Sequence, residues 1–246
     1  MKAPIMITAA MDEVELDQLK KELNDLQKKE GKIATFYEGT LGGYPIVLCH
    51  TKVGSLLAAS AVTEGILNYY PRAIVTQGIA GAHASYIHVG DLVVSTEVIP
   101  IHSYQTPEKK KGEGSDSLSW KIQIFAEGQD EEEKIGIEAD EKLLVCAKTA
   151  QTKMKKQKVF FGRIGSGDVW NREVDRICYL QEHYQTLCEE MEGIAIFQIA
   201  QQYQIPVLDI RAISNHEVLK ESYQREVGKK AQQFTLEVLK EYLKIE

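Results

Sequence analysis

"RAIVTQGIAGA" (residues 72–82) is an apolar run that leads directly into glycines. The apolar part is typical of a buried strand, and residues 55–69 before it have the pattern of a helix. Gly78 and Gly81 let the backbone approach a ligand closely, although glycines at a strand end also serve as plain turns. Their spacing matches neither GxGxxG nor GxxxxGK[ST], so neither a dinucleotide site nor a P-loop is indicated.

The same alternation of short apolar runs and longer amphipathic ones extends along the chain. It predicts strands over 4–10, 43–54, 90–98, 158–168 and 205–215, and a hairpin arm over 35–43 that turns at Gly42-Gly43. The tail, 224–246, is predicted to be a helix docked by one face, which carries Val227, Ala231, Phe234, Val238 and Ile245. Helices between apolar strands favour an α/β fold with three layers, α/β/α, around a central mixed sheet. Ligands in such folds bind at the carboxyl ends of the strands.

Length and composition indicate one domain. A chain of 246 residues with 43% hydrophobic content can bury a sizeable core, so we expect one compact domain over 1–246. Segment 103–140 departs from the alternation, because it is charged, contains several glycines and is broken by Pro107. Since this segment lacks a core of its own, it is predicted to be a loop-rich insertion.

Composition also limits the classes of partner. The net charge of −7, from 29 basic and 36 acidic residues, gives no general attraction to phosphate backbones or anionic lipid. We therefore expect no nucleic acid and no membrane partner, and no apolar run reaches the roughly 18 to 20 residues of a membrane span. Four cysteines far apart, and a start that turns acidic before a signal-peptide core is complete, predict a cytoplasmic protein. The six histidines lack metal-ligand spacing, so no metal and no cofactor is expected.

"CEEMEGIAIF" (188–197) sets three carboxylates against an apolar run at a strand-to-helix junction. Such acids can simply begin a helix, because the helix dipole stabilises negative charge there. A carboxylate at this position can also accept two hydrogen bonds from a vicinal diol such as a ribose. Met191, between Glu190 and Glu192, would then pack on the sugar, or equally fill the core.

Other side chains near predicted strand ends have two interpretations. Trp170, beyond "GSGD" (165–168), offers either a stacking surface for an aromatic base or a core residue. His216 could relay a proton to or from a leaving base at neutral pH, or be a polar loop residue. Asp168 and Arg211 are expected to orient other groups, with buried pairing as the alternative.

Taken together, these motifs resemble the methylthioadenosine/S-adenosylhomocysteine nucleosidases, a family of the purine nucleoside phosphorylase-like superfamily. The resemblance rests on "AAMDEVE" (9–15), the "GIAGA" loop with "HVGDLVVSTE" (88–97), "GSGDVW", "EEMEGIAI" and "RAISN" (211–215), in that order. It covers nearly the whole chain and implies the purine nucleoside phosphorylase-like fold.

The resemblance implies a role for each matching residue. Glu13 would activate the attacking water, with Glu15 as the alternative because "AMDEV" is one residue shorter than the family's loop. Glu192 would hold the ribose hydroxyls above Met191, and Trp170 would stack on the purine. The other residues expected to bind substrate are Met11, Val53, Ile79, Ala80, Gly81, Val169, Glu190 and Ser214. His102 and Tyr104 fall where family members contact a neighbouring subunit, and a homodimer is implied.

Position 215 departs from the family. The family's nucleosidases have an aspartate there that protonates N7 of the leaving adenine, whereas this chain has Asn215. An amide cannot deliver a proton as a carboxylic acid does, although it offers one donor group and one acceptor. Asn215 could therefore select a 6-oxopurine, as in futalosine, or the chain could cleave adenine nucleosides with protonation by water or at a slower rate.

The nucleophile is expected to be water. Phosphorylases of the superfamily bind phosphate with arginines near the first glycine loop, but this sequence has no arginine before Arg72 and none in 76–85. The resemblance thus implies a nucleosidase that hydrolyses the N-glycosidic bond of a 5′-modified purine nucleoside, its small-molecule partner. A phosphate-dependent purine nucleoside phosphorylase and a purine-nucleoside binding protein without turnover remain the alternatives.

Overall fold

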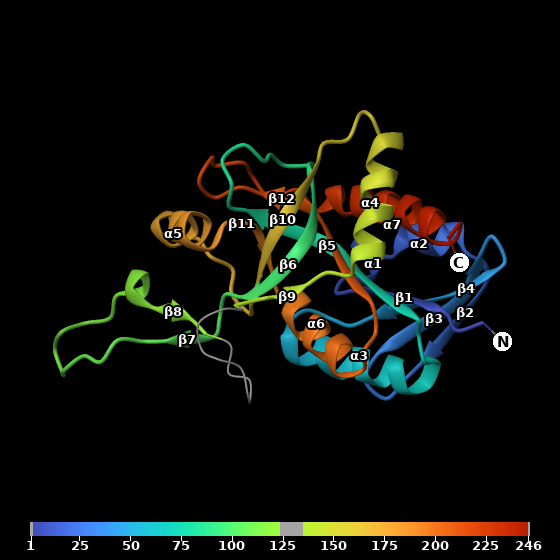
Figure 1. Cartoon of the computed structure of the whole chain (residues 1–246), viewed down its shortest axis with the longest axis horizontal. Helices are drawn as coiled ribbons and strands as arrows, with labels where there is room; N and C mark the ends of the chain where they lie inside the picture. The colour runs from blue at the N-terminus through green and yellow to red at the C-terminus, as the bar shows by residue number, and fades with distance from the viewer. Residues whose placement is uncertain (1, 124–134, 246) are drawn as a thin grey trace.

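The computed structural model describes residues 2–123 and 135–245, and its centre is a ten-stranded sheet (Figure 1). The order across the sheet is β11-β10-β6-β12-β5-β1-β4-β3-β2, with β9 paired to β6. The strands are β1 (Ile5–Ala9), β2 (Asn24–Glu30), β3 (Thr35–Leu41), β4 (Tyr44–His50), β5 (Ala73–Ala82), β6 (Leu92–Pro100), β9 (Ile137–Glu138), β10 (Val159–Ser166), β11 (Thr186–Glu190) and β12 (Val207–Asn215).

The sheet is mixed, as predicted. Strand β1 runs parallel to β4 and β5, β12 is parallel to β5, and β10 is parallel to β6 and β11. Antiparallel pairing of β11 with β5 then closes β5, β12, β6, β10 and β11 into a ring, which the sequence did not predict. Strands β1, β4, β5 and β12 run in one direction, and β6, β10 and β11 run in the opposite one.

Helices cover both faces of the sheet and complete the three predicted layers. On one side α3 (Ser55–Tyr69) packs against α6 (Gly193–Gln202), and on the other α7 (Gly228–Tyr242) packs against α2 (Asp17–Glu22) and α4 (Glu141–Lys153) (Figure 1). The remaining helices are α1 (Asp12–Glu15), α5 (Val174–Tyr184) and the 3-10 turns η1 (Ser117–Ser119) and η2 (Arg225–Val227). In the described part of the chain, none of the helices combines the length and the apolar character that crossing a bilayer requires.

Helix α7 confirms most of the predicted tail. Its apolar stripe, including Phe234 and Val238, is fully buried against the sheet and α4. The inclusion of Ile245 in that stripe was wrong, because the helix ends at Tyr242 and Ile245 is 60% exposed.

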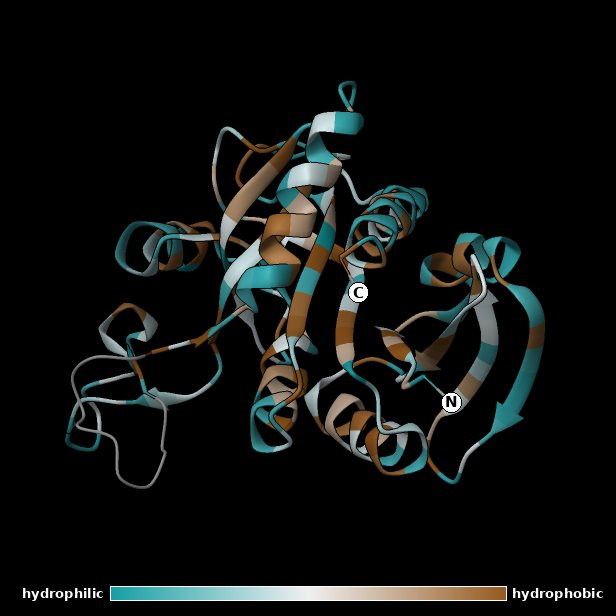
Figure 2. Cartoon of the chain, turned by 45° about the vertical axis from the view of Figure 1, so that its right-hand side comes forward, coloured by the Kyte–Doolittle hydropathy of each residue, from teal (hydrophilic) through white to brown (hydrophobic). Residues whose placement is uncertain are grey.

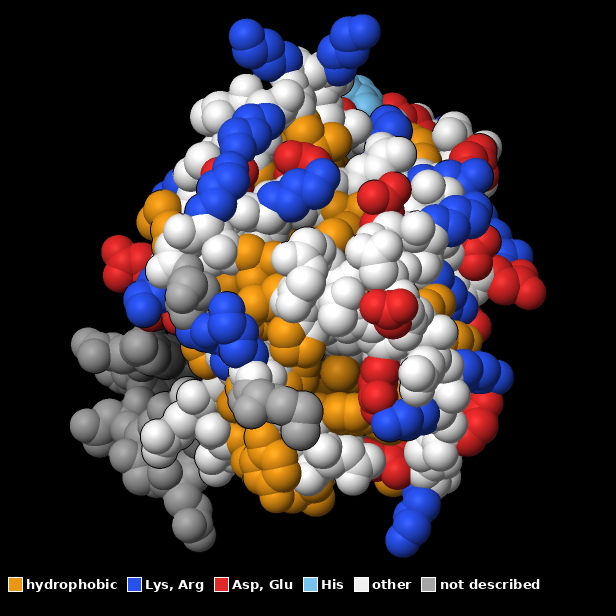
Figure 3. Space-filling view, turned by 90° about the vertical axis from the view of Figure 1, so that its right-hand side faces the viewer, with side chains coloured by type: hydrophobic (Ala, Val, Ile, Leu, Met, Phe, Trp, Pro, Cys, Tyr) orange, Lys and Arg blue, Asp and Glu red, His pale blue; other side chains and the backbone are white. Residues whose placement is uncertain are grey.

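Strand β2 was not predicted, because it has no apolar alternation. Every residue of Asn24–Glu30 is exposed at the edge of the sheet, and this edge is teal beside the browner central strands in Figure 2. Ion pairs join Lys28 to Glu30 and Lys29 to Glu38. Figure 3, which views this side of the molecule, shows acidic and basic side chains intermingled over it. Charges on an edge strand oppose pairing with another chain.

The first part of the predicted insertion forms a small outlying unit, whereas β9 near its end joins the main sheet. Strands β7 (Tyr104–Gln105) and β8 (Lys121–Ile122) pair with each other and not with the main sheet. The guanidinium of Arg176 on α5 lies 5.0 Å from the Tyr104 ring and donates to the carbonyl of Ser117, which ties this unit to α5. Residues 124–134 of the predicted insertion lie outside the described residues.

Candidate active site

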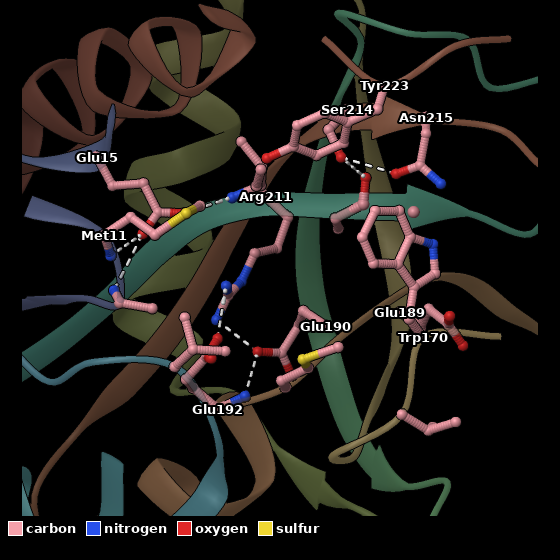
Figure 4. Close-up of a pocket in the computed structure, with 17 residues that line it drawn as sticks. Met11, Glu15, Trp170, Glu189, Glu190, Glu192, Arg211, Ser214, Asn215 and Tyr223 are labelled. Carbon is pink, nitrogen blue, oxygen red and sulfur yellow. Dashed lines mark hydrogen bonds and ion pairs between the residues drawn. The ribbon is translucent and has the colours of Figure 1, made fainter. Parts of the chain in front are cut away.

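A pocket opens where the carboxyl ends of strands from both sets come together in the folded chain. Its lining comes from the ends of β5, β11 and β12 and from the segments that follow β1, β4, β10, β11 and β12. The lining residues are Ala10, Met11, Glu15, Val53, Ile79, Ala80, Gly81, Val169, Trp170, Glu189, Glu190, Met191, Glu192, Arg211, Ser214, Asn215 and Tyr223. All the residues expected to bind substrate are in this set. Figure 4 shows Glu15 and Met11 at one end of the pocket and Trp170 and Asn215 at the other.

Glu13 is not in the pocket, which corrects its predicted place. Its side chain is 87% exposed and its carboxylate lies 3.6 Å from Arg225. Glu15, the alternative, is buried and lines the pocket. Because α1 is a single turn and successive residues are about 100° apart, residues 13 and 15 point to opposite sides.

Three backbone amides hold the Glu15 carboxylate. Oε2 accepts from Ala10 (3.0 Å) and Met11 (2.9 Å), and Oε1 accepts from Ile79 (3.0 Å). A side-chain carbon at Gly78 would collide with Oε1 of Glu15, so this glycine leaves the space that the carboxylate occupies. Burial raises the pKa of Glu15 above its usual range, and this effect outweighs Arg211 and the amides, which lower it.

Arg211 lies at the centre of a cluster of carboxylates. Its Nε donates to Asp209 (2.7 Å), Nη2 to Glu190 (2.6 Å) and Nη1 to Glu192 (3.3 Å). Glu15 also acts on it electrostatically. One guanidinium cannot neutralise four acids, so when all four are ionised the cluster carries excess negative charge.

Glu190 and Glu192 answer the question posed by "CEEMEGIAIF". Glu190 stabilises the start of α6, because its carboxylate accepts hydrogen bonds from the backbone amides of Glu192 (2.8 Å) and Gly193 (2.8 Å). Glu192 makes no capping bond to α6; its Oε1 accepts from the amide of Gly54 (2.9 Å), across the pocket. Thus Glu190 stabilises the start of the helix, and Glu192 faces the ligand space.

The pKa of Glu192 reflects this crowding. Burial, and then the negative charge of Glu190, raise its pKa to about 8 despite the attraction of Arg211. Asp209 is affected in the same way, and its pKa rises to about 7. The cluster therefore holds protons near neutrality that exposed acids would have lost.

The opposite end of the pocket is aromatic and polar. The rings of Trp170 and Tyr223 lie 5.8 Å apart at a tilt of 46°, and both are about half exposed. Ser214 Oγ donates to Asn215 Oδ1 (2.9 Å), while Asn215 Nδ2 donates to Glu217 (3.3 Å). A flat ring entering between these groups would meet stacking surfaces and an amide.

Glu189 is a further pocket residue for which we predicted no role. Its Oε1 accepts from the amide of Asn171 (2.8 Å), and its Oε2 accepts from the Asn171 side chain and lies 3.1 Å from His83 Nε2. His83 Nδ1 in turn lies 2.7 Å from Thr186 Oγ1.

Other predicted residues lie beside the pocket. Asp168 accepts from the backbone (2.7 Å) and hydroxyl (2.6 Å) of Ser55 at the start of α3, which is an orienting role. His216 is fully buried, with Nε2 3.3 Å from the carbonyl of Ala84 and Nδ1 accepting from Leu219, and burial lowers its pKa. These bonds occupy both ring nitrogens, so the structure does not favour the proton relay.

Sequence reasoning missed Ala10, Glu189 and Tyr223 as lining residues, and it placed Arg211 among orienting groups only. Tyr223 had no local signal, because the bridge between His216 and Glu221 sets its position. His102 contacts the carbonyl of Ser166 (3.2 Å) and does not line the pocket. Within 2–123 and 135–245, no group of three or more His, Cys, Asp or Glu residues is arranged to hold a metal ion.

Comparisons with known proteins agree with this architecture. The model of the phosphorylase superfamily matches residues 4–244. A 5′-methylthioadenosine/S-adenosylhomocysteine nucleosidase of Anoxybacillus flavithermus is 29% identical over 212 residues, which is 86% of this chain and 84% of that protein.

Two solved structures are similar over nearly their whole length. The corresponding nucleosidase of S. pneumoniae, solved with the transition-state inhibitor MT-ImmA, has a TM-score of 0.78 and 27% identity over 97% of this chain and 99% of that one. Futalosine hydrolase of Helicobacter pylori also has a TM-score of 0.78, at 21% identity, over 99% and 98% of the two chains. The latter likeness shows the fold alone.

Proposed function

Because this chain belongs to the phosphorylase superfamily, we propose that it is a purine nucleosidase. It hydrolyses the N-glycosidic bond of a 5′-modified nucleoside of the methylthioadenosine or S-adenosylhomocysteine type. The observation that carries the proposal is the convergence of Glu15 and Glu192 on one pocket whose other end holds Trp170 and Asn215. The names of the nucleosidases similar to it support the same substrate class.

Glu15 takes the water-activating role in this proposal. Its raised pKa makes it a stronger base than an exposed glutamate, and three amides fix its orientation. Once deprotonated, it accepts a proton from the water that attacks C1′. The new C–O bond forms as the C–N bond breaks, and that bonding pair leaves with the base.

Glu192 grips the sugar, with Met191 beside it. Its carboxylate can accept hydrogen bonds from the ribose hydroxyls. Positive charge develops on the ring as the bond to the base breaks, as it does in glycoside hydrolysis generally. The carboxylates around Arg211 that are ionised stabilise this positive charge more than they stabilise the neutral substrate, and such a difference accelerates the reaction.

Water suits this pocket better than phosphate. Among the described lining residues Arg211 is the one cation, and each of its nitrogens already pairs with a carboxylate. A phosphate there would face Glu15, Glu190 and Glu192 without a free positive charge. Phosphorolysis is the second candidate reaction, but the carboxylate cluster disfavours phosphate binding in this pocket.

The amide of Asn215 is compatible with two kinds of purine base, a 6-oxopurine and adenine. Its amide can donate to O6 and accept from N7–H, which suits a 6-oxopurine such as the base of futalosine. Adenine fits if water protonates the leaving base. A binding protein without turnover is the third candidate, favoured by the absence of a carboxylic acid at this position.

We propose further that the chain is one domain and acts in the cytoplasm as a homodimer. Helix α3, which follows the pocket residue Val53, exposes Leu56 (80%), Leu57 (42%) and Leu67 (53%). A second copy over this helix would cover these apolar side chains. Sedimentation should give twice the mass of the chain, and Leu56→Glu should give the monomer; a wild-type monomer would contradict the dimer.

The test of function is a product assay. Purified protein is incubated with methylthioadenosine, S-adenosylhomocysteine, inosine and futalosine, with and without phosphate, and free base is measured. The proposal predicts base release that does not depend on phosphate. Release only with phosphate, with ribose 1-phosphate as product, would indicate a phosphorylase, and tight binding without release would indicate a binding protein.

A further inference from the structure

We propose that Glu189 is a positioning residue that sets the indole of Trp170 over the base, acting through Asn171. The inference deepens the proposed function and rests on it for the identity of the ligand. It starts from a buried carboxylate that lines the pocket but has no part in activating water or holding the sugar.

The position of Glu189 places it at the base end of the pocket. On β11 it pairs with Gly81 of β5, and Gly81 pairs on its other side with Asn215 of β12. The three residues therefore occupy neighbouring places on adjacent strands. A side-chain carbon at Gly81 would lie 3.4 Å from Nδ2 of Asn215, which shows how close the Asn215 amide lies to this strand.

The hydrogen bonds of Glu189 all run to one loop and one histidine. Both the backbone and the side chain of Asn171 donate to it, so Glu189 holds the residue next to Trp170 at two points. His83 forms a hydrogen bond to Glu189 through Nε2, and its Nδ1 forms a hydrogen bond with the hydroxyl of Thr186. The chain Thr186–His83–Glu189–Asn171 thus links the sheet to the residue that neighbours the stacking ring.

Maintaining fold stability does not explain a charge at this position. Glu189 is 7% exposed and is close in sequence to Glu190 and Glu192. Burying a carboxylate costs free energy that an apolar residue would avoid. An apolar side chain could not make the two hydrogen bonds to Asn171. Trp170 is half exposed, and within the described residues Glu189 is the hydrogen-bond partner of the Asn171 side chain.

An exchange of the two groups tests this link. Asn171→Asp alone sets two carboxylates against each other and should move the loop. In Asn171→Asp with Glu189→Gln, the acid and the amide have traded places, so the bond between the side chains is restored with its donor reversed. His83 can adjust by shifting its proton to Nδ1, which then donates to Thr186.

The measurement uses full-length protein that carries Trp120→Phe, so that Trp170 is the one remaining tryptophan. Emission and anisotropy are recorded without ligand, and the Kd for free adenine and for hypoxanthine is measured by titration. We expect Asn171→Asp to lower the fluorescence anisotropy of Trp170, because the indole moves more freely. It should also raise the Kd of the better-bound base about tenfold, the change that about 1.4 kcal/mol produces. Adding Glu189→Gln should recover most of both losses. Glu173→Gln, an exposed acid two residues away from Asn171, is the matched control.

The outcomes separate this inference from the proposed function. If the double variant shows no recovery relative to Asn171→Asp alone, the positioning role is overturned. If Trp170 responds as expected in the ligand-free protein but no nucleoside is cleaved, the positioning role stands and the nucleosidase proposal fails. Where turnover is present, KM should rise in Asn171→Asp more than kcat falls, and the reverse split would contradict a role in base binding.

Discussion

Glu15 is the carboxylate of helix α1 that faces the ligand space, and its neighbour Glu13 supplies a matched control. Glu15→Gln should lower kcat by about 10² to 10⁴, the usual contribution of a general base. Glu13→Gln should leave kcat within about twofold, because that side chain is 87% exposed. Steady-state assays of both variants check this, and equal losses in the two would remove Glu15 from the mechanism.

The pH profile gives a second view of the same residue. Since the base must be deprotonated and burial raises the pKa of Glu15, activity should fall on the acid side at a pH above 4.5, the ordinary value. An acid limb in kcat/KM at or below 4.5 would show that an exposed acid governs the rate.

Position 215 lines the base end of the pocket, where the leaving base would receive its proton in the proposed mechanism. An aspartate at 215 would lie beside Glu217, whose Oε1 is 3.3 Å from the present amide, and this second charge would help it keep its proton. Asn215→Asp should therefore raise the rate with adenine nucleosides by about 10² and lower it with 6-oxopurine nucleosides. Rates measured on methylthioadenosine and inosine test the reversal, and unchanged preference would exclude position 215 from base selection.

Most pocket residues could be predicted from the sequence, because they occur within short motifs at strand ends. The error at Glu13 has a local cause, since two residues on one helical turn point to opposite sides and a loop one residue shorter hides which of them faces inward. Glu189 was missed for a different reason. Its partners His83 and Asn171 are distant along the chain, and the pairing of β11 with both β5 and β10 brings them together.

At the level of elements, the loop after β10 is fastened to helix α3. Asp168 accepts from the amide and the hydroxyl of Ser55, so a side chain from one element caps another. Asp168→Ala should cost about 1 kcal/mol of stability, as the loss of a helix cap typically does. It should also weaken purine binding, because the same loop carries Trp170. Chemical denaturation and adenine titration would check both effects, and a stability loss with unchanged binding would uncouple the cap from the pocket.

Strand and helix prediction succeeded where one face is buried. Helix α3 was predicted over its full range, and the hairpin turns at Gly42-Gly43, both of which have positive φ. Strand β2 could not be predicted, because its polar residues owe their conformation to pairing with β3. Closure of the ring by β11 and β5 is likewise a tertiary event without a local pattern.

For the whole molecule, the carboxylate cluster makes stability depend on pH. Because the pKa of Glu192 rises from 4.5 to about 8 on folding, the folded state keeps a proton that the unfolded state has lost between these values. Stability of the ligand-free protein should therefore decrease as pH rises from about 5 to 8.

Glu192→Gln removes this titration and should flatten that dependence. Above pH 8 the variant should melt at least about 2–4 °C higher than the wild type, the shift that 1 kcal/mol produces in a chain of this size. It should also lose ribose recognition. Thermal melts at pH 5 and 8.5, with Glu173→Gln as the control, test this, and a variant that unfolds instead would assign Glu192 to the fold alone.

The origin of the oxygen in the sugar product tests the central claim most directly. The reaction is run in H₂¹⁸O with phosphate present, on whichever nucleoside releases base fastest, and the products are analysed by mass spectrometry. Hydrolysis in this pocket predicts one ¹⁸O in the free sugar, no sugar phosphate, and loss of both products in Glu15→Gln. Unlabelled ribose 1-phosphate, or labelled sugar formed equally well by Glu15→Gln, would contradict the account.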